Sequence, residues 1–263
     1  MLELIDTHCH LTSFDAERLS QVLINAESRN VKKMLCVGAG MGDDSPGLAV
    51  SLANKYSNIW ASVGVHPHGA ASVANVSHLS RLAADKRVVA IGETGLDFFR
   101  DWAPKESQVE LFVSSIVLAR EYKKPLIIHT RDALEETFAI MEREKAWEVG
   151  GVVHCFAGDA DFAERLRDIN FKVSFPGSIT FKKADKLRTV VKQIPLEQIM
   201  LETDTPFMAP EPFRGKDSEP MHVYEVAKKI AELRELPIEE IARVTSKNAM
   251  ELFKFCDYTV SKK

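Results

Sequence analysis

The stretch that decides the fold is Leu4-Ile-Asp-Thr-His-Cys-His10, an apolar start followed by reactive side chains. We expect it to form a β-strand, in which residues two apart point to the same side. His8 and His10 then share one face, about 7 Å apart between Cα atoms, and Cys9 points to the opposite face. Two imidazoles at that spacing can bind one ion at about 2.0–2.1 Å each. The stretch therefore predicts half of a metal site at the end of a buried strand.

Seven more short apolar runs follow this one, with helical patterns between them. The eight runs are residues 2–8, 33–38, 59–66, 88–95, 125–129, 151–156, 171–175 and 199–203. Helices are predicted around residues 19–26 and at 46–56, 76–86, 104–122, 132–145, 159–169, 184–191, 219–233 and 237–253. Alternating strands and helices indicate a parallel sheet. Eight such units in 263 residues favour a closed (β/α)8 TIM barrel, an α/β fold, over an open doubly wound sheet.

The composition is that of a globular chain with a normal core: 45% hydrophobic and 27% charged residues. We find no linker or repeat, and expect one hydrolase barrel domain over residues 1–263 with a frayed tail at 259–263. A net charge of −4 argues against tight electrostatic binding of long duplex nucleic acid. It does not exclude an anionic substrate, since bound cations can reverse the local charge.

The four cysteines are widely spaced, without a Cys-x-x-Cys pair. We interpret Cys9, Cys36, Cys155 and Cys256 as reduced thiols of a cytoplasmic protein. The chain starts without a secretion-signal pattern, and no apolar run is long enough to span a membrane. The oligomeric state stays open, with a monomer as our expectation.

The reactive residue types gather where the predicted strands end. They are His8 and His10, His66, Glu93, His129, His154, and Glu202 with Asp204. In a barrel these strand ends meet at one mouth, where barrel active sites lie. Each residue taken singly fits an ordinary loop position, but the set matches the ligands that Zn²⁺, Mn²⁺ or Mg²⁺ use.

The motifs together resemble the TatD family, metal-dependent deoxyribonucleases with an amidohydrolase-like barrel. The resemblance rests on Asp-Thr-His-Cys-His, Gly-Val-His-Pro, Gly-Glu-Thr-Gly-Leu-Asp, His129, His154, Leu-Glu-Thr-Asp-Thr-Pro, Arg-Gly-Lys and Thr245-Ser-x-Asn248. It implies a (β/α)8 barrel with two or more divalent ions (Mg, Mn or Zn). Carried over by motif, His8, His10 and Asp204 would hold one ion, His129 and His154 another, and Glu93 would bridge them.

Two metal ions close together suit phosphodiester cleavage. Asp204 is then our choice for general base. Glu202 is assigned a supporting catalytic role, against the equal alternative of a buried acid satisfied by backbone donors. His66 and Arg214 are candidate substrate contacts, through the leaving group and a phosphate.

Surface residues near the expected mouth have two interpretations each. The basic run Lys182, Lys183, Lys186 and Arg188 either steers a nucleic-acid strand or forms an ordinary solvated helix face. Phe98, Phe99, Trp102 and Phe207 either stack on unpaired bases or pack in the loops. Cys9 and Cys155 adjoin ligand histidines, but strand alternation predicts that both point away.

The sequence leads to one preferred function and two alternatives. We expect a 3′-5′ exodeoxyribonuclease acting on single-stranded DNA or nucleotides. The first alternative is hydrolysis of small amides, lactones or phosphoesters at the same site, since fold does not fix function. The second is a scaffold with an idle site.

Overall fold

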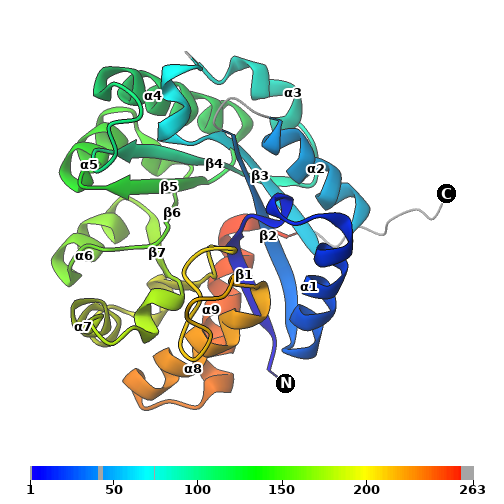
Figure 1. The fold of residues 1–263 in the computed structure, drawn as a ribbon. Helices are drawn as coiled ribbons and strands as arrows, with labels where there is room; N and C mark the ends of the chain where they lie inside the picture. The colour runs from blue at the N-terminus through cyan, green and yellow to red at the C-terminus, as the bar shows by residue number, and fades with distance from the viewer. Residues whose placement is uncertain (1, 41–43, 74, 256–263) are drawn as a thin grey trace. The chain divides into compact units, whose positions relative to one another are not determined.

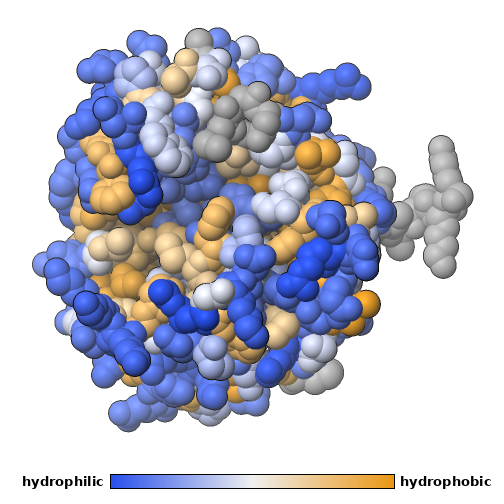
Figure 2. Space-filling model, in the orientation of Figure 1, coloured by the Kyte–Doolittle hydropathy of each residue, from blue (hydrophilic) through white to orange (hydrophobic). Residues whose placement is uncertain are grey.

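The computed structural model describes residues 2–40, 44–73 and 75–255. Cys256 and the predicted tail at 259–263 lie outside the described residues. Among the residues that are described, no helix has the length and apolar character needed to cross a bilayer. The face drawn in Figure 2 is mostly hydrophilic, with apolar side chains in separate groups.

Eight strands form one sheet in the order of the sequence, from β1 to β8. They are β1 (Leu4–Cys9), β2 (Val31–Gly40), β3 (Ile59–Val65), β4 (Val88–Asp97), β5 (Leu126–Arg131), β6 (Gly151–Val153), β7 (Phe171–Phe175) and β8 (Ile199–Leu201). The registers described, β3–β4, β4–β5, β5–β6 and β7–β8, are all parallel. β1 and β8, the two ends of this order, also contact each other, as a closed barrel requires.

The α-helices follow the predicted alternation. They are α1 (Ala16–Ser28), α2 (Ser45–Lys55), α3 (Ser80–Ala83), α4 (Lys105–Tyr122), α5 (Leu134–Arg143), α6 (Ala160–Asp168), α7 (Asp185–Gln193), α8 (Val223–Arg234) and α9 (Ile238–Phe253).

The prediction of one helix over residues 76–86 is wrong. The segment divides into a 3-10 turn, Ser77–Leu79, and the short α3. Asn75 Oδ1 accepts hydrogen bonds from the backbone N–H and the hydroxyl of Ser77. Side-chain bonds of this kind give the backbone an alternative to a helix.

The chain divides into two compact units, which we describe separately. Unit 1 comprises the residues up to Leu35, Cys155–Arg167 and Lys172–Glu251. Unit 2 comprises Cys36–His154, Asp168–Phe171 and the residues from Leu252 onward.

In unit 1, helix α8 lies against β1 and β8 (Figure 1). Its buried residues Val223, Val226, Ala227 and Ile230 recur at helical spacing. All six residues of β1 are buried, including the polar Asp6, Thr7 and His8. A buried polar group is costly unless it has a partner, so these side chains must have a structural or chemical use.

In unit 2, β4 lies beside β5, and helix α4 covers β4 (Figure 1). All ten residues of β4 are buried, as expected for a strand covered on both faces. Trp60 packs between the Arg87 guanidinium, 4.3 Å from its ring centre, and the Phe255 ring.

Gly95 is required where β4 approaches β5 most closely. Its φ is +138°, and a Cβ there would lie 2.0 Å from the carbonyl oxygen of His129. We expect Gly95→Ala to lower the free energy of unfolding by about 1–3 kcal/mol, because the backbone must shift. Urea unfolding measures this loss. Gly215→Ala is the matched control, because Gly215 also has positive φ but nothing within 4 Å of its Cβ position. An equal loss at both sites would contradict the role of the close contact.

Candidate metal centre

His8, His10 and Asp204 converge in unit 1. The Nε2 atoms of His8 and His10 lie 3.3 Å apart, and they lie 3.7 and 3.5 Å from Asp204 Oδ1. Atoms that ligate one octahedral or tetrahedral ion at about 2.0–2.1 Å lie about 2.8–3.4 Å from one another. The three observed separations are within a few tenths of an ångström of that range, so this donor set fits a divalent ion.

The alternation of β1 accounts for the pair of imidazoles. The His8 and His10 rings face each other edge-on at 5.0 Å. Cys9, between them, places its thiol 3.3 Å from the carbonyl oxygen of Leu35, which accepts its hydrogen bond. The strand therefore separates the two imidazoles from the thiol, as the sequence predicts.

Asp6 positions this cluster, and its role was missed at the level of sequence. Its carboxylate accepts hydrogen bonds from the backbone N–H of His8 and Thr203 and from the Thr203 hydroxyl. The backbone N–H of Asp204 in turn donates to the His8 carbonyl at 2.9 Å. Burial raises the pKa of Asp6 to about 8, against the opposing effect of these hydrogen bonds. The available signal in the sequence was the position of Asp6, two residues before His8.

Glu93, His129 and His154 converge in unit 2. Glu93 Oε1 lies 2.9 Å from His129 Nδ1 and 2.8 Å from His154 Nε2, and these two nitrogens lie 3.3 Å apart. His66 Nε2 lies 3.6 Å from the same Glu93 oxygen. The separations again match the spacing of ligand atoms around one ion. A buried carboxylate among three imidazoles is thus a second fitting donor set.

Electrostatics in this cluster follow from burial and close contacts. Burial lowers the pKa of His66 to about 3, despite its proximity to Glu93. Burial also disfavours the charged form of His129, but hydrogen bonds with Asp97 and Glu93 outweigh it and raise its pKa to about 9. Burial opposes ionisation of Glu93 too, but the nearby imidazoles hold its pKa well below the usual value. The carboxylate is therefore ionised at neutral pH and available to a cation.

Asp97 is a second residue that sequence reasoning missed. Its Oδ2 lies 3.1 Å from His129 Nε2 and 3.0 Å from His68 Nε2. In a neutral imidazole, a bond from the Nε2–H group to a carboxylate would leave Nδ1 for a metal ion, a common arrangement behind metal-binding histidines. The sequence did offer a signal for Asp97, because this residue ends the Gly-Glu-Thr-Gly-Leu-Asp motif.

We expect Asp97→Asn to weaken binding of one divalent ion by about 10- to 100-fold, because His129 loses the acceptor that fixes its ring. Competition with a chelating dye measures the affinity. Asp101→Asn, on the following loop, is exposed and serves as the control. An unchanged affinity in Asp97→Asn would contradict this role.

Glu202 is fully buried with both carboxylate oxygens engaged. Oε1 accepts from the backbone N–H of Cys155 at 2.7 Å, and Oε2 accepts from the Ser174 hydroxyl at 2.6 Å. Within unit 1, Glu202 follows β8 and thus connects Cys155, which follows β6, with Ser174 on β7. A catalytic role for Glu202 stays a prediction, and the geometry favours the alternative of an acid satisfied by protein donors.

The prediction that Cys155 points away from the ligands is wrong. Its thiol lies 3.7 Å from Asp204 Oδ2. The strand β6 ends at Val153, before the predicted end at 156, and Cys155 has a φ of 46°. Alternation holds only in extended backbone, so a left-handed residue after the strand redirects the side chain.

The candidate substrate contacts have different surroundings. His66 belongs to the Glu93 cluster, whereas the exposed Arg214 guanidinium stacks 3.8 Å from the centre of the Phe181 ring. Arg188 donates to the carbonyls of Ile179, Phe181 and Lys182 and to Asp185, so it stabilises its own loop. This use favours the structural interpretation of the basic run for Arg188.

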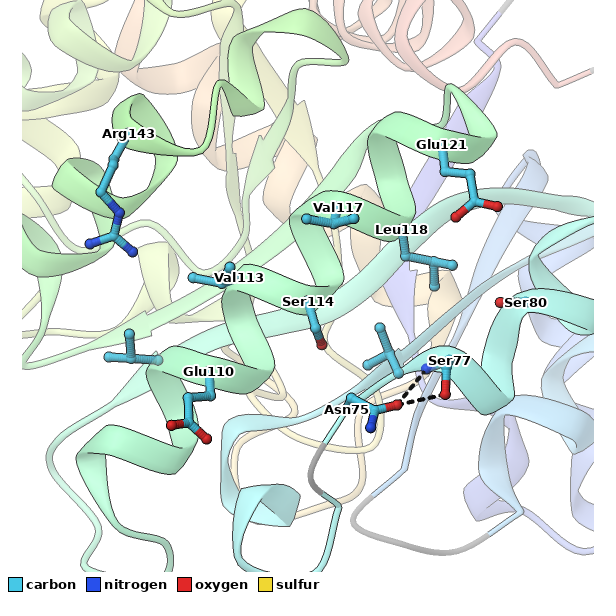
Figure 3. A pocket seen from close by; sticks show the side chains of 12 residues that line it. Asn75, Ser77, Ser80, Glu110, Val113, Ser114, Val117, Leu118, Glu121 and Arg143 are labelled. Atoms are coloured by element: carbon cyan, nitrogen blue, oxygen red, sulfur yellow. Dashed lines mark hydrogen bonds between the residues drawn. The ribbon is translucent and has the colours of Figure 1, made fainter.

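A groove of about 650 Å³ lies along α4 in unit 2 (Figure 3). Val113, Val117 and Leu118 line it, with Glu110 and Glu121 at its border. None of the predicted site residues lines this groove. We therefore do not place the active site there.

The chain is similar to known proteins over nearly its whole length. It is 42% identical to the metal-dependent hydrolase YabD of Bacillus subtilis, covering 95% of this chain and 99% of that protein. It is 41% identical to the metal-dependent hydrolase YcfH of Escherichia coli, covering 95% of each. The crystal structure of the TatD homologue YjjV of Escherichia coli superposes with a TM-score of 0.87 at 30% identity, covering 96% of this chain and 98% of that one.

This structural match and the strand order confirm the predicted (β/α)8 barrel. The family model described as TatD related DNase matches residues 5–254. The family model matches nearly the whole chain, the relatives are metal-dependent hydrolases, and two donor sets fit divalent ions. The chain is therefore a metal-dependent hydrolase of the TatD family.

Proposed function

We propose that the protein is a divalent-metal-dependent 3′-5′ exodeoxyribonuclease that acts on single-stranded DNA. The observation that carries the proposal is the convergence of His8, His10 and Asp204 within 3.7 Å of one another. The family description, TatD related DNase, supports a phosphodiester substrate.

We assign one ion to His8, His10 and Asp204, and another to Glu93, His129 and His154; Mg²⁺, Mn²⁺ and Zn²⁺ are the candidates. When bound, such ions act as Lewis acids on the phosphate and lower the pKa of a coordinated water. Asp204 accepts the proton of the attacking water, because an ionised carboxylate at the reacting centre can act as general base. His66 contacts the leaving group, and Arg214 holds a phosphate through its planar donors.

The assay is release of mononucleotides from a single-stranded oligonucleotide labelled at its 5′ end. We expect shortening from the 3′ end that requires a divalent ion and is lost with EDTA. A panel of amide, lactone and small phosphoester substrates runs beside it, because the metal centre alone does not select the bond. Turnover of a panel substrate without oligonucleotide shortening with Mg²⁺, Mn²⁺ or Zn²⁺ would contradict the proposal and favour the alternative function.

We further propose that the chain forms one catalytic domain, which the family match over residues 5–254 supports. Cys9, Cys36 and Cys155 are reduced thiols, in keeping with the expected cytoplasmic location. That location and the expected monomer stay predictions.

A further inference from the structure

Two large aromatic side chains are exposed on the loop between β4 and α4. Phe99 is 50% exposed and Trp102 is 57% exposed. Exposing rings of this size forgoes the free energy that burial would provide. Exposed aromatic rings on one short loop of a hydrolase therefore indicate a binding function.

The loop is held in place by buried hydrogen bonds. Gln108 accepts from the Asp97 backbone N–H at 2.8 Å and donates to the carbonyls of Asp97 and Ala103. Asp97 Oδ1 accepts from the backbone N–H of Phe99 and Arg100. The rings therefore start from a fixed backbone, which reduces the entropy lost on binding a ligand.

Two arginines accompany the rings. The Arg131 guanidinium lies 3.6 Å from the centre of the Phe99 ring, and that of Arg100 lies 5.4 Å from the centre of the Trp102 ring. Neither arginine forms an ion pair within residues 2–40, 44–73 and 75–255. An arginine stacked on a ring keeps its N–H edge available for phosphate oxygens. We call Phe99, Arg100, Trp102 and Arg131 the aromatic–arginine cluster.

A row of rings joins this cluster to the Glu93 donor set within unit 2. Trp102 packs edge-on against His68 at 4.5 Å, and His68 packs against His66 at 4.3 Å. His66 lies 4.6 Å from His129 between ring centres. A nucleic-acid strand that stacks on Trp102 would therefore lie close to His129, since only the rings of His68 and His66 lie between them in this row.

We propose that the aromatic–arginine cluster binds an unpaired DNA strand whose end reaches the Glu93 donor set of unit 2, which rests on the proposed function. Unpaired bases stack on Phe99 and Trp102, while Arg100 and Arg131 contact phosphates. Duplex DNA is excluded from this mode because its bases already stack on each other. The cluster therefore accounts for a preference for single strands.

The test measures binding of a fluorescein-labelled ten-nucleotide oligothymidylate by anisotropy, with phosphorothioate linkages to prevent cleavage. We expect Trp102→Leu and Phe99→Leu to weaken binding by about 5- to 100-fold each. Arg131→Gln lowers the slope of log affinity against log salt by about 0.7. Trp147→Leu is the aromatic control, since Trp147 is 47% exposed on another turn, and Arg81→Gln, on the exposed side of α3, is the arginine control.

Equal affinities of Trp102→Leu and Trp147→Leu would overturn the cluster proposal, as would equal binding of duplex and single strands by the unmodified protein. If the protein shortens oligonucleotides while the cluster variants bind normally, the cluster proposal fails and the proposed function stands. If oligonucleotides bind through the cluster but are never cleaved, the proposed function fails.

Discussion

Asp204→Ala should lower the rate of metal-dependent hydrolysis by about 10³-fold or more, because it removes both a proposed metal ligand and the proposed general base. The measurement is single-turnover cleavage at saturating metal ion. Asp217→Ala, an exposed acid on the loop after β8, is the control and should retain full activity. Activity of Asp204→Ala within about tenfold of the unmodified protein would contradict the assignment.

Metal content separates the two roles of Asp204. His10→Ala removes a proposed ligand without removing the proposed base. Asp204→Asn keeps an oxygen atom that can bind an ion but removes the carboxylate. We expect His10→Ala to lose bound ion in elemental analysis. Asp204→Asn should retain a larger fraction of its bound ion than of its hydrolysis rate.

Glu93→Gln should have the second large effect, a loss of about 10²-fold or more in rate together with loss of one bound ion. A buried carboxylate 2.8–2.9 Å from two imidazole nitrogens supplies the only negative charge of that donor set. Elemental analysis after dialysis against buffer with limiting metal measures the ion. Glu106→Gln, an exposed acid in the first turn of α4, is the control. Two ions retained in Glu93→Gln would show that Glu93 is not a ligand.

Alternation and the position of strand ends were sufficient to predict which of several candidate side chains lie together. His8 and His10 share a face because β1 is extended through Cys9. His129 follows from the same logic, since β5 runs through it. In such regular backbone, the sequence spacing alone fixes the direction of a side chain.

The prediction failed at Cys155, where the backbone leaves the regular strand. Cys155 and Asp204 both have positive φ, at 46° and 56°, and neither is a residue for which that conformation can be assumed. The backbone N–H of Cys155 donates to Glu202 and that of Asp204 donates to the His8 carbonyl, and both bonds connect residues far apart in the chain. Such long-range contacts cannot be predicted from the neighbouring residues in the sequence.

The missed acids have a related cause. Asp6 and Asp97 belong to the same motifs as the proposed metal ligands. In the structure, however, Asp6 bonds to the backbone of His8 and Asp97 bonds to the ring of His129, so each acid positions a proposed ligand. From the sequence alone, an acidic residue after a strand is equally consistent with a metal ligand, a general base or a residue that positions a ligand. Only distances to the imidazoles separate these roles.

The most direct test is anomalous diffraction from crystals grown with Mn²⁺, with data collected near the manganese absorption edge. We expect anomalous peaks at bonding distance from His8, His10 and Asp204, and from Glu93, His129 and His154. Peaks only at other residues, or none at full manganese saturation, would contradict the metal centre on which the account depends.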